Sequence, residues 1–282
     1  MADLPQLRAS DGEGAGDDLR GRPAVSAAAP EELLDVACAA ALAAGALLRA
    51  RFEAGREPAI ASKSTPTDPV SDADLESQRA IRELISGRRP ADGFLAEEEG
   101  ADQGGSSGLR WVVDPLDGTV NFLYGIPQWC VSVAVLDGDR ALAGVVHDPL
   151  GGETFTALRG GPASCNGREL AARAGDAPTL AQSLVATGFS YDSELRARHG
   201  ELVARMVPLV RDIRRFGAAA LDLTWTAMGR YDAFYERGLK LWDIAAGVLV
   251  CECAGLLVEE IDGGLLVAPP ALAPELERLI AG

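Results

Sequence analysis

Histidine is scarce in this chain, which contains only His147 and His199 among 282 residues. The two histidines and the cysteines form no zinc-ligand spacing, so a zinc site is not expected. A GxSxG motif is also absent, which argues against a serine hydrolase built on a nucleophile elbow. A 12-residue EF-hand loop is missing as well, so calcium storage by that motif is not expected.

The cysteines are few and odd in number: Cys38, Cys130, Cys165, Cys251 and Cys253. Their positions show no spacing typical of a disulfide framework. An odd set of this kind in a long chain predicts reduced, mostly buried thiols in a cytoplasmic protein.

Basic residues are also in short supply, because 26 Lys and Arg stand against 42 Asp and Glu, which gives a formal net charge of −16. A chain with this balance repels nucleic acid and anionic membranes, so neither is an expected partner. The first residues show no apolar signal-peptide segment. We find no uninterrupted run of about 18 apolar residues, so no membrane span is expected.

The length and the 48% hydrophobic content suit one compact unit or two closely packed halves. Residues 1–29 are rich in Gly, Asp, Ala and Pro without periodicity, which predicts a disordered N-terminal tail. Residues 30–180 carry short strands and hairpin turns, typical of an α+β half with an antiparallel sheet. Residues 181–282 alternate strands and helices, which is typical of an α/β half.

Hydrophobic periodicity and turn signals locate the elements. In the first half, helices are expected over 31–52 and 72–86, and strands over 94–96, 110–114, 129–136, 140–147 and 153–158. Tight turns are expected at Asp137-Gly138-Asp139 and Asn166-Gly167. In the second half, strands are expected over 183–189 and 231–236, helices over 193–211, 219–229 and 241–255, and two short strands with a final helix over 273–282.

Acidic residues gather at three points: Glu97-Glu98-Glu99 follows FLA, Asp114 and Asp117 follow WVV, and Asp243 opens a helix. Each has an ordinary structural explanation. A glutamate run is usually a solvated loop, Asp-Pro and Asp-Gly pairs form turns, and an aspartate in the first turn complements the helix dipole.

The stretch DPLDGT, residues 114–119, also has the chemistry of a cation site. Pro115 fixes φ and Gly118 permits close backbone approach, so both aspartates and the Leu116 carbonyl can aim at one point. Carboxylate and carbonyl oxygens suit Mg²⁺ or Mn²⁺. A short helix beginning at Thr119 would add N–H groups for an anion, and the combination suits phosphate-ester chemistry.

Several spaced motifs together resemble the inositol monophosphatase family: FLAEE (94–98), WVVDPLDGTVNFLYGIPQWCVSVAV (111–135) and LKLWDIAAGVLVCECAG (239–255). PVSDAD (69–74) and RRFGAAALDL (214–223) add support, and the similarity spans about residues 31–280. The resemblance implies an αβαβα layered sandwich and a magnesium-dependent phosphomonoesterase acting on inositol 1-phosphate or a similar cyclitol or sugar phosphate.

The resemblance also implies roles for individual residues. Two or three Mg²⁺ ions, or Mn²⁺, would be held by Glu97, Asp114, the Leu116 carbonyl, Asp117 and Asp243, with Glu98 as a nearby support. Glu97, Thr119 and Asp74 would be catalytic, Thr119 orienting the attacking water with help from Asp74. Asp74 also fits a capping box that begins with Ser71. Lys63 is placed near the metal site, or equally on an exposed loop.

The substrate phosphate would meet Gly118 and Thr119, and its ring would meet Gly217, Ala218, Ala219 and Glu236. Asp117, which could also touch a ring hydroxyl, and Asp243 would be further substrate contacts. Glu236 could instead be a surface charge at the end of a strand. Ala96, Ala218 and Phe189 depart from the family pattern, which affects substrate choice rather than metal binding.

Alternative functions stay open at this stage. The chain could hydrolyse histidinol phosphate or another small sugar phosphate, or act without catalysis as a regulatory partner of RNA or of transcription. The family resemblance further implies lithium sensitivity and a homodimer. Trp129 fits either the core or such an interface.

Overall fold

The computed structural model describes residues 29–55, 61–62, 69–98, 103–170 and 178–282. Residues 1–28 of the predicted tail, Lys63 and Glu99 lie outside this part of the chain. The helices are α1 (Pro30–Ala54), α2 (Asp72–Arg88), α3 (Thr119–Tyr124), α4 (Ser193–Met206), α5 (Ala219–Ala227), α6 (Leu241–Cys253) and α7 (Ala273–Ala281).

The strands form three sheets. They are β1 (Ala61–Ser62), β2 (Pro69–Val70), β3 (Gly93–Ala96), β4 (Leu109–Asp117), β5 (Cys130–Asp137), β6 (Arg140–Asp148), β7 (Glu153–Leu158), β8 (Ala163–Cys165), β9 (Arg168–Glu169), β10 (Leu184–Thr187), β11 (Asp212–Arg214), β12 (Ala233–Arg237), β13 (Leu257–Ile261) and β14 (Gly264–Ala268). A single 3₁₀ turn, Leu180–Gln182, precedes β10.

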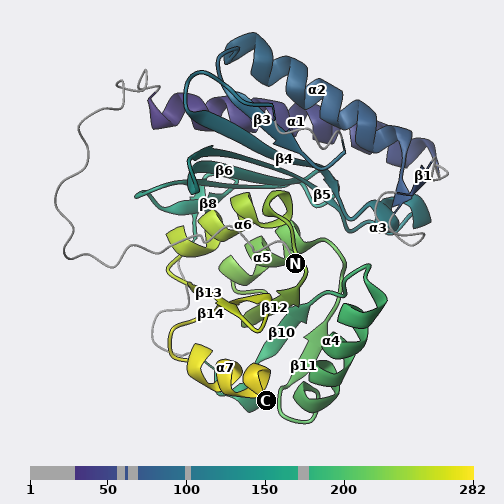
Figure 1. Cartoon of the computed structure of the whole chain (residues 1–282), viewed down its shortest axis with the longest axis vertical. Coiled ribbons are helices and arrows are strands. Elements are labelled where there is room, and N and C mark those ends of the chain that lie inside the picture. The colour runs from purple at the N-terminus through teal and green to yellow at the C-terminus, as the bar shows by residue number, and fades with distance from the viewer. Residues whose placement is uncertain (1–28, 56–60, 63–68, 99–102, 171–177) are drawn as a thin grey trace.

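Five layers stack in the molecule (Figure 1). Helices α1 and α2 cover a seven-stranded sheet, α5 and α6 lie between this sheet and a five-stranded sheet, and α4 and α7 cover the far side. The predicted αβαβα sandwich is therefore confirmed. The seven-stranded sheet uses residues 93–169 and the five-stranded sheet residues 184–268, while the division of the chain into halves at 180 and 181 stays a prediction.

The seven-stranded sheet runs in chain order from β3 to β9. Its pairs are antiparallel except for β3 and β4, which are parallel. The five-stranded sheet has the order β11-β10-β12-β14-β13, in which β10 is parallel to β11 and β12 and the remaining pairs are antiparallel. The ends of β3 and β4 therefore meet at one edge, which positions the acidic residues that follow them.

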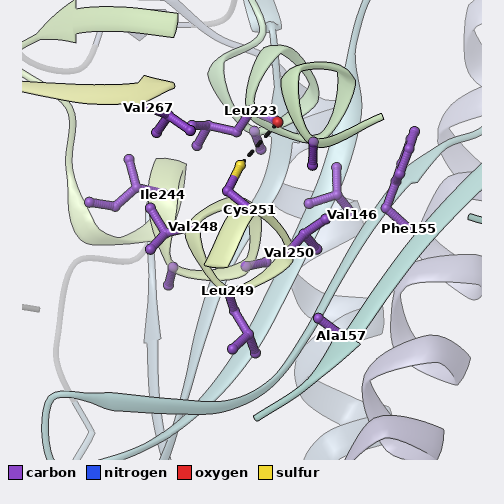
Figure 2. Close-up of a cluster of buried hydrophobic side chains, with 14 of the residues drawn as sticks. Val146, Phe155, Ala157, Leu223, Ile244, Val248, Leu249, Val250, Cys251 and Val267 are labelled. Atoms are coloured by element: carbon purple, nitrogen blue, oxygen red, sulfur yellow. Dashed lines mark hydrogen bonds between the residues drawn. The ribbon is translucent and has the colours of Figure 1, made fainter. Parts of the chain in front are cut away.

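Alternation along β4 divides the core into two clusters. Trp111 and Val113 pack in the cluster beneath α1 and α2, whereas Val112 faces the cluster that contains α5 and α6. Helix α6 is apolar on most sides because it lies between the seven-stranded and the five-stranded sheet. In Figure 2 its Cys251 thiol donates a 3.2 Å hydrogen bond to the carbonyl oxygen of Leu223 on α5.

Helix α1 is long and apolar enough, by length and composition alone, to cross a membrane. Its apolar face packs against α2 and the seven-stranded sheet, and Leu33, Val36 and Leu48 on that face are buried. Packing in the core explains the apolar character of this helix.

The structure corrects several element boundaries. The helix expected over 193–211 ends at Met206, and residues 212–214 form β11, which pairs in parallel with β10.

The predicted turns at 137–139 and 166–167 are present between β5 and β6 and between β8 and β9. All five cysteines are free thiols, as expected. Trp129 is 1% exposed and packs edge-on against Phe122 in the core.

Candidate active site

A pocket between the two sheets collects most of the predicted site residues. It is bounded by the segments that follow β3, β4 and β10, by the loop before α5, by β12 and by the start of α6. Its lining comprises Glu97, Asp114, Leu116, Asp117, Gly118, Thr119, Phe189, Tyr191, Arg215, Gly217, Ala219, Glu236, Leu239 and Asp243. Segments up to 146 residues apart in sequence, from Glu97 to Asp243, thus meet at one place.

The DPLDGT segment is a rigid bend at the end of β4. The pairing of β4 with β5 is interrupted by a bulge between Asp114 and Asp117. Oδ1 of Asp114 accepts a 3.0 Å hydrogen bond from the Leu116 N–H, and the Ser77 hydroxyl donates a 2.7 Å bond to the Pro115 carbonyl. These bonds hold Asp114 and Pro115 in the bend, as the bulge and the turn residues predict.

Glycine is required at position 118 for two reasons. Gly118 has φ of 95°, in the left-handed region, and a Cβ there would lie 2.9 Å from the Gln128 carbonyl oxygen. This tight turn directs the chain from β4 into α3, so that Thr119 faces the pocket.

Asp117 connects the seven-stranded sheet to helix α5. Its Oδ2 accepts a 2.7 Å hydrogen bond from the N–H of Ala220 in the first turn of that helix, and the Cys130 thiol lies 3.6 Å away. A carboxylate at a helix N-terminus is stabilised by the free N–H groups and by the helix dipole. The position of Asp117 therefore depends on both halves of the chain.

Thr119 and Asp74 are directly connected. The Thr119 hydroxyl lies 2.9 Å from Oδ1 of Asp74 and 3.1 Å from the Leu116 carbonyl oxygen. Oδ2 of Asp74 accepts hydrogen bonds from the N–H and the hydroxyl of Ser71. Asp74 is fully buried and does not line the pocket itself, so its contact with the site runs through Thr119.

Asp243 and Glu236 line the pocket from the first turn of α6 and from β12. Oδ2 of Asp243 accepts a 2.6 Å hydrogen bond from the Lys240 N–H at the start of α6. Glu236 extends from β12 toward the end of β10, where a Cβ on Gly188 would overlap its carboxylate. Because residue 188 is a glycine without a side chain, the Glu236 carboxylate can occupy this space.

Burial and mutual repulsion disfavour negative charge in this pocket. Burial, reinforced by the charge of Glu97, raises the pKa of Asp117 to about 6. The same two causes hold the pKa of Asp243 well above its usual range. Burial also raises the pKa of Glu236 to about 8, an effect that Arg215 partly opposes. Crowded carboxylates with raised pKa values are stabilised by cations.

The donor set fits hard divalent cations, because it offers carboxylates and the Leu116 carbonyl without histidine. Within the residues that the structure describes, no three acidic, histidine or cysteine side chains are already spaced as a closed ligand cluster. One oxygen of Asp117 and one of Asp243 accept backbone N–H groups instead.

Besides Asp74, two predicted site residues in the described part of the chain do not line the pocket. Ala218 is fully buried in the hydrophobic core at the start of α5 and does not line the pocket, so the expected contact with a substrate ring is not supported there. Glu98 lies beside the site, where its N–H donates a 3.0 Å hydrogen bond to Oε1 of Gln78. Lys63 lies outside the described residues.

Sequence reasoning missed four residues at the site: Gly188, Tyr191, Arg215 and Leu239. Arg215 stands in RRFGAAALDL, a stretch that supported the family resemblance without a role for its arginines. An arginine beside a predicted ring-binding segment is the signal that points to it. Phe189, noted only as a departure from the family pattern, also lines the pocket.

Comparison with known proteins agrees with this geometry. The model of the "Inositol monophosphatase family" matches residues 29–281. "Inositol-1-monophosphatase SuhB" of Mycobacterium tuberculosis is 42% identical over 232 residues, covering 77% of this chain and 80% of the relative. "Nus factor SuhB" of Pasteurella multocida is 38% identical over 253 residues, covering 86% and 94%.

Solved structures show the same similarity. The extragenic suppressor protein suhB from Bartonella henselae superposes with a TM-score of 0.81 at 35% identity, covering 87% of this chain and 97% of the other. The match to the family model extends over nearly all of the described residues, including the pocket and the bend at 114–119. The chain therefore belongs to the inositol monophosphatase family.

Proposed function

We propose that this protein is a magnesium-dependent phosphomonoesterase that hydrolyses inositol 1-phosphate, or a similar cyclitol or sugar phosphate, to the free polyol and phosphate. The observation that carries the proposal is the convergence of Glu97, Asp114, Asp117 and Asp243 on one pocket beside Thr119. Family membership supports a phosphatase; the metal and the substrate are our inference.

The proposed cofactor is two or three Mg²⁺ ions, for which Mn²⁺ is a possible substitute. Glu97, Asp114, Asp117, Asp243 and the Leu116 carbonyl would hold them. When bound, these ions neutralise the phosphoryl oxygens and lower the pKa of a water molecule so that it can attack phosphorus.

Thr119 would orient the attacking water. Its hydroxyl has one proton, and the Asp74 carboxylate at 2.9 Å is a stronger acceptor for it than the Leu116 carbonyl at 3.1 Å. With its proton directed toward Asp74, Oγ1 of Thr119 presents its lone pairs to the water. Because Asp74 is itself fixed by Ser71, the direction of this lone pair is set before the substrate binds.

The polyol would lie between Glu236, Gly217 and Ala219, with the Glu236 carboxylate accepting a hydrogen bond from a ring hydroxyl. Phe189, Tyr191 and Leu239 line the same pocket and would exclude water from one face of the ring. The carboxylate chemistry of this end suits a hydroxyl-rich substrate.

A substrate panel tests this proposal. Release of inorganic phosphate would be measured with inositol 1-phosphate, histidinol phosphate, fructose 1,6-bisphosphate and 3′-phosphoadenosine 5′-phosphate, each with Mg²⁺ and with chelator. We expect the highest kcat/KM for inositol 1-phosphate, and no turnover in chelator. Preference for histidinol phosphate or a sugar phosphate would replace the substrate but keep the chemistry.

The name of the Pasteurella multocida relative, Nus factor SuhB, favours a second candidate function as a regulatory partner of RNA or of transcription. The net charge of −16 makes a protein partner a better candidate than RNA itself. Binding to RNA polymerase without turnover of any phosphate ester would favour this second function over the first.

We also propose a homodimer, a cytoplasmic location and inhibition by lithium, each as an extension of the family assignment. Exposed apolar side chains at Tyr124, Ile126 and Phe216 offer surface for self-association. Sedimentation of the purified protein tests the dimer, and the rate of phosphate release in lithium chloride tests the inhibition.

A further inference from the structure

Arg215 is the single cationic side chain that lines the pocket in the part of the chain that the structure describes. Its guanidinium carbon lies 6.0 Å from the centroid of the Phe189 ring. It also lies across Gly217, where a Cβ would collide with Nη1. Arg215 therefore lies at the part of the pocket that holds Phe189 and Gly217.

The guanidinium is available to a ligand. Among the described residues it makes no direct hydrogen bond or ion pair, and the side chain is exposed. Its charge is nevertheless felt by Glu236, because Arg215 opposes the rise in the pKa of that carboxyl. A planar donor with five N–H groups thus stands near a carboxylate that only accepts when ionised.

We propose that Arg215 determines substrate specificity by binding, together with Glu236, two adjacent hydroxyl groups of a phosphorylated cyclitol. Arg215 donates to one hydroxyl oxygen, and the other hydroxyl donates to Glu236. This inference rests on the proposed phosphatase function and names the class of substrate: phosphate esters with a vicinal diol.

The same geometry disfavours certain substrates. A phosphate ester that carries an ammonium group in place of a hydroxyl would bring positive charge toward Arg215, and it offers no lone pair to accept from the guanidinium. Histidinol phosphate has such a group. Arg215 therefore helps the protein to discriminate cyclitol phosphates from amino alcohol phosphates.

The experiment compares three esters with the full-length magnesium-loaded protein. Inositol 1-phosphate carries vicinal hydroxyls, histidinol phosphate carries an ammonium group, and p-nitrophenyl phosphate has neither but has a good leaving group that keeps its rate measurable. kcat/KM is measured for the wild type, Arg215→Gln and Arg215→Lys. The matched control is Arg214→Gln, because Arg214 is adjacent in sequence but bonds to Asp212.

Loss of a charged hydrogen-bond donor should lower kcat/KM for inositol 1-phosphate by about 10- to 100-fold in Arg215→Gln. We expect kcat/KM for p-nitrophenyl phosphate to stay within about threefold of the wild type, since the guanidinium has no hydroxyl to bind there. For histidinol phosphate it should stay level or rise. With inositol 1-phosphate, kcat/KM of Arg215→Lys should lie between the values for the wild type and for Arg215→Gln. Lysine keeps the charge but not the planar donor geometry. Arg214→Gln should behave as the wild type with all three esters.

An equal loss with inositol 1-phosphate and p-nitrophenyl phosphate would assign Arg215 to the phosphate and overturn the diol inference. So would an unchanged rate with inositol 1-phosphate. Both results leave the phosphatase function standing. If the wild type hydrolyses none of the three esters, the proposed function fails and this inference fails with it.

Discussion

The hydroxyl of Thr119 lies 2.9 Å from Oδ1 of Asp74, a residue 45 positions earlier in the chain. The other oxygen of this buried carboxylate accepts the N–H of Ser71 at 2.9 Å and its hydroxyl at 2.6 Å. The capping role and the role in orienting Thr119, which the sequence leaves as alternatives, are thus combined in one carboxylate. Asp74 links the start of α2 to the proposed site of water attack.

Replacing Thr119 with valine removes the hydroxyl but keeps the shape of the side chain. We expect kcat for inositol 1-phosphate to fall by about 10²- to 10⁴-fold, because the attacking water loses its positioned partner. Thr119→Ser keeps the hydroxyl and should recover most of the rate. Steady-state kinetics of the two variants, with thermal unfolding as a check of folding, makes the comparison. Full activity in Thr119→Val would remove Thr119 from the mechanism.

The two roles of Asp74 can be separated by mutation. Asp74→Asn should lower both the free energy of unfolding, by about 1–3 kcal/mol, and the rate of phosphate release, since an amide cannot accept on both sides. Ser71→Ala should cost about 1 kcal/mol through the weakened cap while the rate stays near that of the wild type. Urea unfolding and phosphate release are measured on the same preparations. A catalytic loss in Ser71→Ala as large as that in Asp74→Asn would show that the cap alone matters.

The stability of the metal-free protein should depend on pH in an unusual direction. In the folded state the pKa of Glu236 is raised to about 8 from its ordinary value of 4.5. Between these two pH values the folded protein therefore binds more protons than the unfolded chain. The contribution of Glu236 to the free energy of unfolding is complete below pH 4.5 and is lost as pH rises toward 8. We expect the Tm to fall between pH 5 and pH 8 in chelator.

Glu236→Gln should flatten part of that slope, because glutamine does not titrate. For a chain of this length each kcal/mol corresponds to a Tm change of about 2–4 °C, which scanning calorimetry resolves. Added Mg²⁺ should raise the Tm more at pH 8 than at pH 5, since protons compete with the cation for carboxylates. A slope that is identical in Glu236→Gln and the wild type would contradict the raised pKa.

The space beside Glu236 gives a further prediction. Gly188→Ala places a Cβ where the Glu236 carboxylate lies, so the carboxylate must move. We expect KM for inositol 1-phosphate to rise by about 10-fold or more, as for the loss of one hydrogen bond to a charged group. The matched control is Gly200→Ala on α4, where a Cβ meets no atom within 4 Å. Equal kinetics in the two variants would show that Glu236 does not bind the substrate.

Short local motifs predict much of this molecule because their chemistry is local. Pro115 and Gly118 predict the bend that carries Asp114 and Asp117, and short apolar runs such as WVV predict β4 and β5. The capping box at Ser71 and Asp74 is likewise visible in four consecutive residues.

Other features depend on contacts that a single sequence does not reveal. Strand β11 has three residues, too few for periodicity, and exists because β10 offers it a parallel edge. Arg214 and Arg215 are adjacent and chemically identical, yet Arg215 lines the pocket whereas Arg214 bonds to Asp212. Ala218 is packed in the hydrophobic core and does not line the pocket, so its predicted contact with a substrate is not supported.

The central claim is that the carboxylates of the pocket bind divalent cations, and Mg²⁺ titration by isothermal calorimetry tests it most directly. Wild-type protein should bind Mg²⁺ with a measurable enthalpy. Asp114→Asn should raise the Kd for Mg²⁺ by about 10-fold or more because it removes a charged oxygen ligand. Glu194→Gln, at an exposed position of α4 that does not line the pocket, should leave the Kd unchanged. Equal Mg²⁺ binding by the wild type and Asp114→Asn, or no binding by either, would contradict the account.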